Sequence, residues 1–282
     1  MKSAFFNIRQ FINHQKIDCI TQIDRSMVEQ YLMEQKIKKN WSPRTIKNNI
    51  QNLSTFLAYC VQQGHIIKNP IIGIPIPKQR KSLPKALKDE DAMRLLEWTY
   101  VADFYYEYNR VRARAIIAMF LFTGIRRAEL LNLKVSDVRI HEKVVRIECG
   151  KGGKDRLIPM NGSLISILKQ YLENQRKYKK VSPYFFTSLR NNNKLHHIVI
   201  LRLFGKIKRD LQLNVYPHKL RHTFATLMLH GNCDIYALSK MMGHSDIKTT
   251  TIYLGLTTNH LNEQINKHPL GFRADLPHKK FA

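Results

Sequence analysis

Apolar residues recur at helical spacing in the first part of the chain. The clearest example begins at Ser42, a good N-cap residue followed by Pro43, and ends at Gly64. Its apolar face consists of residues three or four positions apart: Ile46, Ile50, Leu53, Leu57 and Val61. A preceding helix is expected after Asp24, which is a second capping residue. The first part of the chain is therefore predicted to be helical.

The second part combines helical periodicity with one alternating stretch. Lys143–Cys149 alternates in a strand-like pattern, and Asp155–Met160 follows it after the glycine-rich segment Gly150–Lys154. This arrangement predicts a β-hairpin with a flexible tip. Helices are predicted at five places: from Asp89, Arg112–Phe122, Ser163–Tyr178, His218–His230 and Asp234–Met242. The expected fold class is mainly α-helical with a small β-sheet.

A basic segment rich in proline, Asn69–Leu87, separates the two parts. Its four prolines exclude a continuous helix or a central strand. They are Pro70, Pro75, Pro77 and Pro84. We place the domain boundary here, with a helical domain over residues 1–80, a linker over 81–87 and a second domain over 88–282. The length of 282 residues agrees with two domains.

The composition narrows the class of partner. Lys and Arg number 47 against 21 Asp and Glu, a net charge of +26, which points to a polyanion, most simply nucleic acid. Ala115–Ile125 is the longest useful apolar stretch and is far shorter than the ~20 residues of a membrane span. The four cysteines form no C-x-x-C pair, so a disulfide framework and a thiolate zinc site are not expected, and a reducing cytoplasm fits.

The positive charge is not confined to one tail. Residues 1–83 carry 13 basic and 4 acidic residues, and residues 84–282 carry 34 and 17. Both parts are therefore expected to face the polyanion. On the helix after Ser42, Arg44 and Lys47 lie away from the apolar face. For each of them a solvated surface position is the simpler interpretation, and contact with DNA is the second.

Two stretches place cations at turns. Thr123–Leu130 ends one helix at Gly124 and starts another with Arg126 in its first turn, where an arginine suits an anion. Taken alone, that arginine favours a surface ion pair with Glu129 or Glu90. The hairpin tip presents Lys151 and Lys154 but does not have the spacing of a phosphate-binding P-loop. Taken alone, it favours a solvated turn.

Two further stretches carry histidines and a tyrosine. His218 and Arg221 share one helix face, and His222 gives the i, i+4 spacing of a zinc helix. Lys219 occupies the position where a metalloprotease has its glutamate, which argues against zinc. Gly243 joins two short helical segments, so that Asp234–Tyr253 taken alone is consistent with a helix-turn-helix or with plain helix packing.

In combination these residue types suit phosphodiester chemistry without a metal. Two arginines stabilise charge on non-bridging oxygens, and a tyrosine hydroxyl supplies a covalent nucleophile. A histidine accepts its proton, and a lysine protonates the leaving 5′ oxygen.

The order of these motifs resembles that of the tyrosine site-specific recombinases, the phage integrase family, especially its compact Xer-type and transposon-encoded members. The resemblance covers nearly the whole chain and is strongest over Thr123–Leu256. It implies six catalytic residues: Arg126, Lys151, His218, Arg221, His244 and Tyr253, with Tyr253 as the nucleophile. Glu129 matches a carboxylate that supports the site in the family.

The resemblance also implies an architecture and a mechanism. We expect a C-shaped clamp made of a helical core-binding domain and a mixed α/β catalytic domain. Tyr253 would attack a DNA phosphate to give a 3′-phosphotyrosine, and two strand exchanges through a Holliday junction would recombine paired core sites. Neither ATP, metal nor another cofactor is required. The family's active unit is a homo-tetramer on double-stranded DNA, in some cases with a partner recombinase.

The chain differs from the family pattern in two respects, and the segment after Tyr253 carries a further expectation. The helical first domain is short, and no additional amino-terminal arm-binding domain is apparent, which favours simple core sites. After Tyr253, His260–Lys267 is predicted to form a short amphipathic helix bearing Leu261 and Ile265. We expect this helix to dock on a neighbouring subunit, with docking on its own domain as the alternative.

Two other activities remain open on the sequence alone. A type IB topoisomerase uses a similar site to relax supercoils, and a non-catalytic regulator would use Asp234–Tyr253 only to bind DNA. The sequence does not distinguish integration, excision, resolution and inversion, and it does not give the DNA site.

Overall fold

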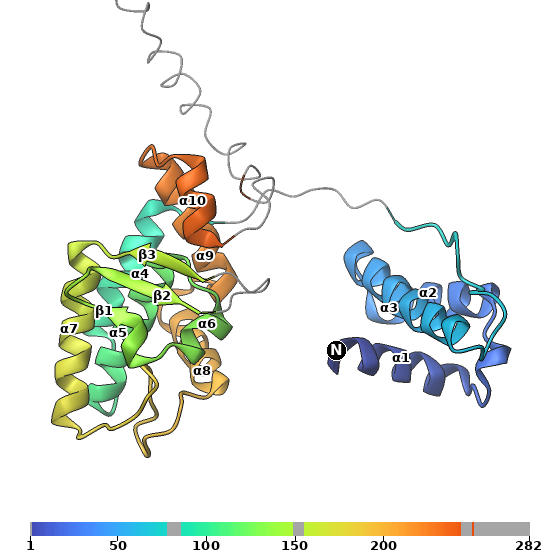
Figure 1. The fold of residues 1–282 in the computed structure, drawn as a ribbon, viewed down its shortest axis with the longest axis horizontal. Helices are drawn as coiled ribbons and strands as arrows, with labels where there is room; N and C mark the ends of the chain where they lie inside the picture. The colour runs from blue at the N-terminus through green and yellow to red at the C-terminus, as the bar shows by residue number, and fades with distance from the viewer. Residues whose placement is uncertain (1, 78–85, 149–154, 244–249, 251–282) are drawn as a thin grey trace, which may run out of the picture. The chain divides into compact units, whose positions relative to one another are not determined.

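The computed structural model of the chain describes residues 2–77, 86–148, 155–243 and 250. It divides into two compact units, Met1–Ser82 and Leu83–Ala282. Each unit has its own hydrophobic core, and Figure 1 labels the helices and strands of each unit. The boundary between the units falls within the proline-rich segment. The domain limits at residues 80 and 88 stay a prediction.

Every regular element in the described part of the first unit is a helix. Its elements are α1 (Lys2–Gln15), the 3₁₀ turn η1 (Ile20–Gln22), α2 (Arg25–Lys39) and α3 (Pro43–Gln62). The two predicted caps are confirmed: Asp24 accepts a hydrogen bond from the Met27 N–H at 2.7 Å, and Ser42 accepts one from Thr45. After α3, Ile71 and Ile74 are buried in the core of this unit. The first half of the proline-rich segment is therefore part of the packed first unit.

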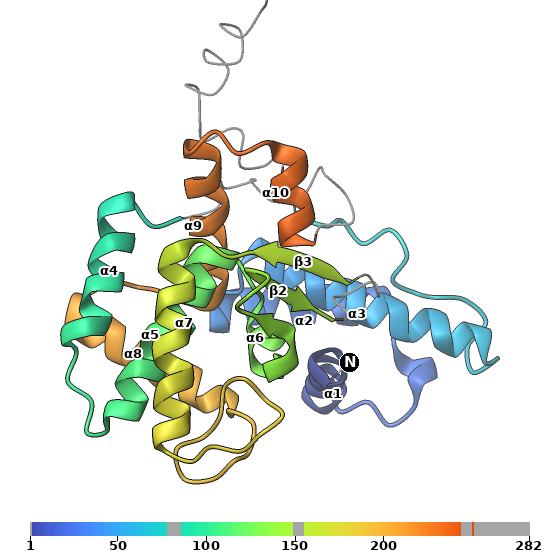
Figure 2. The ribbon, with the colours of Figure 1, turned by 60° about the vertical axis from the view of Figure 1, so that its left-hand side comes forward.

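The second unit surrounds a central helix. Its elements are α4 (Asp89–Val101), α5 (Glu107–Thr123), α6 (Arg127–Asn132), η2 (Val135–Asp137), β1 (Val138–Arg139), β2 (Val144–Ile147), β3 (Arg156–Pro159), α7 (Gly162–Lys177), α8 (His197–Leu211), α9 (Pro217–His230) and α10 (Ile235–Met242). Helix α5 packs against α4, α7 and α9 (Figure 2). Every residue of this helix from Arg112 to Leu121 is buried. The expectation of a mainly α-helical fold with a small sheet is confirmed.

The sheet has three antiparallel strands in the order β1-β2-β3. Strands β2 and β3 form the predicted hairpin arms, with Val145 opposite Ile158 and Ile147 opposite Arg156. The hairpin tip, residues 149–154, lies outside the described residues. β3 contacts α10, so the sheet and the last described helix meet.

Strand β1 and helix α8 were not predicted. β1 is only two residues long and carries little pattern of its own. Helix α8 contains the run Ile198–Ile200 and Gly205, residue types that are unfavourable in helix interiors. Burial of Ile200, Leu203, Phe204 and Ile207 at helical spacing explains why the segment is a helix, since packing overrides weak propensity.

Candidate functional site

The site is built where helix ends converge. Gly124 ends α5 with a backbone φ of +59°, in the left-handed region that glycine adopts without strain. A Cβ atom at this position would lie 2.4 Å from Cδ1 of Phe224, which is buried on α9. Glycine therefore permits both the turn and the close approach of α9. Arg126 follows as the N-cap of α6.

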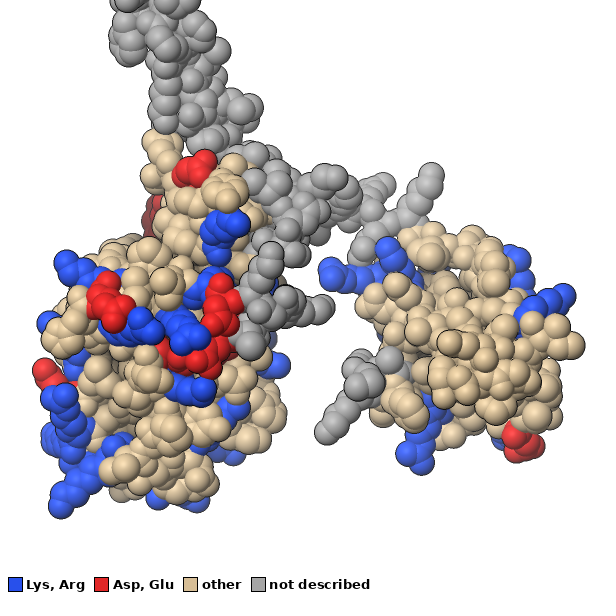
Figure 3. Space-filling view, viewed as in Figure 1, with Lys and Arg blue, Asp and Glu red and all other residues tan. Residues whose placement is uncertain are grey.

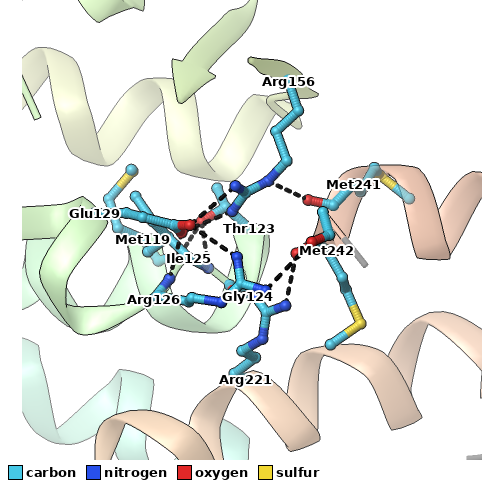
Figure 4. Close-up of polar contacts among 11 residues, drawn as sticks. Met119, Thr123, Gly124, Ile125, Arg126, Glu129, Arg156, Arg221, Met241 and Met242 are labelled. Carbon is cyan, nitrogen blue, oxygen red and sulfur yellow. Dashed lines mark hydrogen bonds and ion pairs between the residues drawn. The ribbon is translucent and has the colours of Figure 1, made fainter. Parts of the chain in front are cut away.

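Arg221 on α9 stabilises the turn at Gly124 by hydrogen bonding. Its guanidinium is buried, with Nη1 donating to the carbonyl oxygen of Gly124 and Nη2 to that of Met242, both at 2.6 Å (Figure 4). These carbonyls belong to the last turns of α5 and α10, which have no partners for them within the helices. One side chain thus joins the ends of α5 and α10 to α9.

Glu129 is shared by two arginines. Arg126 donates to it from its backbone N–H at 2.8 Å and from Nη1 at 2.9 Å. Arg156 on β3 donates to both carboxylate oxygens, at 3.0 and 2.7 Å. Burial raises the pKa of Glu129, but the hydrogen bonds and charges of the two arginines lower it to about 2. Glu129 is therefore ionised at neutral pH.

Arg126 lies closer to solvent than its neighbours. Its side chain is 29% exposed, compared with 9% for Glu129. Nη2 also approaches the carbonyl of Gly243 at 3.3 Å. The surface ion pair with Glu129 considered from the sequence is present, but the carboxylate is buried and divided between two cations. The pairing with Glu129 and an anion-binding role for Arg126 are therefore compatible.

His218 lies in the first turn of α9, one helical turn before Arg221. Burial lowers the pKa of His218, and the neighbouring arginines, Arg221 foremost, lower it further. Burial also lowers the pKa of His222, with His218 and Arg221 adding to the effect. Both imidazoles are therefore neutral at neutral pH and able to accept a proton.

The structure brings together four of the residues singled out from the sequence: Arg126, Glu129, His218 and Arg221. Lys151, His244 and Tyr253 lie outside the described residues. Arg44 and Lys47 are exposed on α3 in the first unit.

Arg156 is a site residue that the sequence analysis missed. It closes the run Gly150–Arg156 that includes the hairpin tip, but no role was assigned to it. Its alternation with Ile158, which is fully buried, was an available signal. An arginine on the inner face of a strand requires a partner, and Glu129 is that partner.

Surface charge is spread over both units. Figure 3 shows Lys and Arg side chains on the visible face of both units, at many places on the second unit and mainly around the edge of the first. A mixed network lies beside the hairpin arms, where Lys134 pairs with Glu148 and Arg146 pairs with Asp155. Among the described residues, no helix is long and apolar enough to cross a membrane. The described part of the chain also holds no group of three His, Cys, Asp or Glu side chains arranged for a metal ion.

Comparison with known proteins finds a family match that includes all the second-unit site residues described above. The family model described as "Phage integrase family" matches residues 74–260. The tyrosine recombinase XerA of Pyrococcus horikoshii is 35% identical over 237 residues, 83% of this chain and 76% of that protein. XerC of Haemophilus influenzae is 33% identical over 263 residues, 92% of this chain and 86% of that protein.

Solved structures show the same fold. A crystal structure of XerA recombinase, 27% identical, matches with a TM-score of 0.56 over 95% of this chain and 91% of that one. XerH bound to difH in a pre-cleavage complex matches with a TM-score of 0.72 at 24% identity, over 94% of this chain and 77% of that one. The Tn1549 integrase in complex with circular intermediate DNA gives 0.72 at 19% identity, over 94% of each chain.

Proposed function

Because the chain belongs to the phage integrase family and is a site-specific recombinase that cleaves and rejoins DNA, we propose that Tyr253 is its nucleophile and that Arg126 and Arg221 bind the scissile phosphate. The observation that carries this assignment is the convergence of Arg126 and Arg221 at the ends of α5 and α10, with His218 near enough for the charges of both arginines to lower its pKa. The chain after α10 leads to His244 and Tyr253.

The arginines supply the electrostatic part of the reaction. A phosphodiester gains negative charge on its non-bridging oxygens as the nucleophile attacks, and fixed guanidinium groups stabilise that charge without rearranging. Arg221 is held by two backbone carbonyls and Arg126 by Glu129, so both cations are oriented before DNA binds. Such preorganisation supports a metal-free mechanism.

The proposed cleavage step exchanges one bond at phosphorus and moves two protons. The Tyr253 hydroxyl loses its proton to the neutral His218 as its oxygen forms a bond to phosphorus. The bond between phosphorus and the 5′ oxygen breaks, and Lys151 donates a proton to that oxygen. His244 donates a hydrogen bond to the phosphate. The product is a 3′-phosphotyrosine and a free 5′-hydroxyl, and attack by a second 5′-hydroxyl rejoins the strands without ATP.

Double-stranded DNA with paired core sites is the proposed partner. XerH bound to difH and a lambda integrase dimer bound to a core site are similar in fold. The net charge of +26 and the exposed Arg44 and Lys47 support DNA contact by both units. We further propose a homo-tetramer on two synapsed sites, with or without a partner recombinase, acting in the cytoplasm where the DNA lies.

The decisive experiment uses Tyr253→Phe on a DNA carrying the core site. The substitution keeps the ring and removes only the hydroxyl, so binding should persist while the covalent protein–DNA complex disappears from denaturing gels. Tyr236→Phe is the matched control, because Tyr236 is exposed on α10 and has no assigned role. Covalent complex formed by the Tyr253 variant would refute the assignment. Products from a plasmid with two sites separate recombination from topoisomerase-like relaxation.

A further inference from the structure

Arg156 uses all three of its guanidinium nitrogens within the site (Figure 4). Nη1 and Nη2 donate to the two oxygens of Glu129 at 3.0 and 2.7 Å, and Nε donates to the carbonyl oxygen of Met241 at 2.9 Å. The side chain is only 8% exposed. This contact pattern matches the fork of donors that arginine has and lysine lacks.

The charge balance around Glu129 is the first consequence. One carboxylate faces two guanidinium groups, so the trio of Arg126, Glu129 and Arg156 keeps one net positive charge. The shorter contact, at 2.7 Å, belongs to Arg156, and the more exposed cation is Arg126. Without Arg156 the carboxylate would be balanced by Arg126 alone, and the pair would be neutral.

The geometry of the α10 end is the second consequence. The carbonyl of Met241 lies in the last turn of α10, where helical partners are missing, and Arg156 supplies a donor. Gly243 follows with a φ of +65°, and a Cβ there would lie 2.9 Å from Cδ of Arg156. Arg156 therefore holds the segment whose Gly243 carbonyl also contacts Arg126.

We propose that Arg156 is a positioning residue for DNA cleavage: by binding both oxygens of Glu129 it leaves Arg126 with its positive charge for the phosphate, and by binding Met241 it fixes the turn at Gly243. This inference rests on the proposed phosphate-binding role of Arg126. It assigns to the strand after the hairpin tip an electrostatic role in the site, in addition to its structural role in the sheet.

The test compares two substrates that differ in one charge. Single-turnover formation of the covalent complex is measured on a normal phosphodiester and on a neutral methylphosphonate at the scissile position. The variants are Arg156→Met, Arg156→Lys and Arg126→Met, with Arg139→Met as the matched control. Arg139 is a sheet arginine that pairs only with the exposed Glu142 among the described residues.

On the phosphodiester, Arg156→Lys keeps the charge but not the fork of donors and should lose less activity than Arg156→Met. Arg156→Met should cleave roughly 10- to 100-fold more slowly than the parent while binding the site normally, the range typical when a residue that orients a functional group is removed. On the methylphosphonate the deficit should shrink, as it should for Arg126→Met, because the transition state then needs less positive charge. Arg139→Met should behave like the parent on both substrates.

A double variant separates an electrostatic effect of losing Arg156 from an effect on folding. If Arg156 acts by balancing Glu129, then Glu129→Gln added to Arg156→Met should recover part of the cleavage rate, and it also removes the buried charge that would destabilise the single variant. An unchanged deficit on the methylphosphonate, or no recovery in the double variant, would overturn the proposal. If Arg126→Met itself showed no dependence on phosphate charge, the assigned role of Arg126 would be the one that fails.

Discussion

Nη1 of Arg221 lies 2.6 Å from the carbonyl oxygen of Gly124, which joins α9 to the end of α5. The contact depends on a turn that only glycine forms easily, because Gly124 has a positive φ and lies against the ring of Phe224. Gly124 thus fixes the position of the Arg221 guanidinium.

Gly124→Ala should therefore destabilise the second unit. We expect a loss of roughly 2–4 kcal/mol, combining left-handed strain with overpacking against Phe224. Urea unfolding followed by circular dichroism measures it. Gly162→Ala is the control, since a Cβ at Gly162 meets nothing within 4 Å and its φ is not positive. Equal midpoints for the two variants would contradict the packing argument.

The pH dependence of cleavage should reflect the lowered pKa of His218. If the neutral imidazole is the proton acceptor, as proposed, the rate should stay level as pH falls to the ordinary value of 6.5 and decline below it. The lowered pKa of His218 also makes the stability of the folded state depend on pH. The folded state binds the proton less tightly than the unfolded state, so stability falls as pH drops through 6.5.

Single-turnover cleavage measured between pH 5 and pH 8 tests this expectation, with the pH values chosen to span the ordinary histidine range. His218→Asn should lower the rate by roughly 10²–10⁴-fold and abolish the acid limb. His222→Gln should keep the limb, because His222 has no assigned proton transfer. An acid limb centred above 6.5 would show that a different group titrates.

Local signals predicted much of the fold. The caps at Asp24 and Ser42 and the stops at Gly124 and Gly243 are short-range features, and each lies where it was expected. Helix α8 was not predicted because its stability comes from burial against the rest of the second unit. That burial cannot be read from the local sequence.

The candidate site also combines residues that local sequence predicted with one that depends on tertiary packing. Arg126, His218 and Arg221 belong to recognisable motifs, whereas the role of Arg156 depends on pairing with Glu129, 27 positions away in sequence. Sequence spacing does not show which strand residue faces which helix. The contact becomes visible only when β3 and α6 are placed together.

Lys151 should act as the general acid. Lys151→Ala is expected to slow cleavage by roughly 10²–10⁴-fold on a normal substrate. A substrate with sulfur at the bridging 5′ position has a leaving group that needs no protonation, so the variant should recover its rate. Lys154→Ala provides the control from the same tip. Recovery confined to the Lys154 variant would transfer the role to that residue.

DNA affinity should fall steeply with salt, because each neutralised phosphate releases about 0.9 counterion. Arg44→Ala and Lys47→Ala, both on the exposed side of α3, should weaken binding and reduce the slope of log affinity against log salt by roughly one each. Gln51→Ala, exposed on the same helix, is the control. Normal binding by both variants would mean that this face of α3 is only solvated surface.

The segment after Tyr253 should act between subunits. In the helix predicted over His260–Lys267, Leu261 and Ile265 form one apolar stripe, and a helix of that length is marginal in water unless such a stripe is buried. Docking on a neighbouring protomer would couple assembly of the tetramer to the position of the nucleophile just upstream.

Deleting the residues after Leu256 should therefore leave binding to a single core site largely intact while abolishing synapsis and recombination of two sites. Gel-shift analysis measures the first property, and product formation on a two-site plasmid measures the second. Leu261→Ala combined with Ile265→Ala should reproduce the defect without shortening the chain, because only the apolar stripe is lost. If the truncated chain recombines two sites at the full-length rate, the segment does not carry the subunit contact. If it loses binding to one site as well, the segment instead stabilises its own domain.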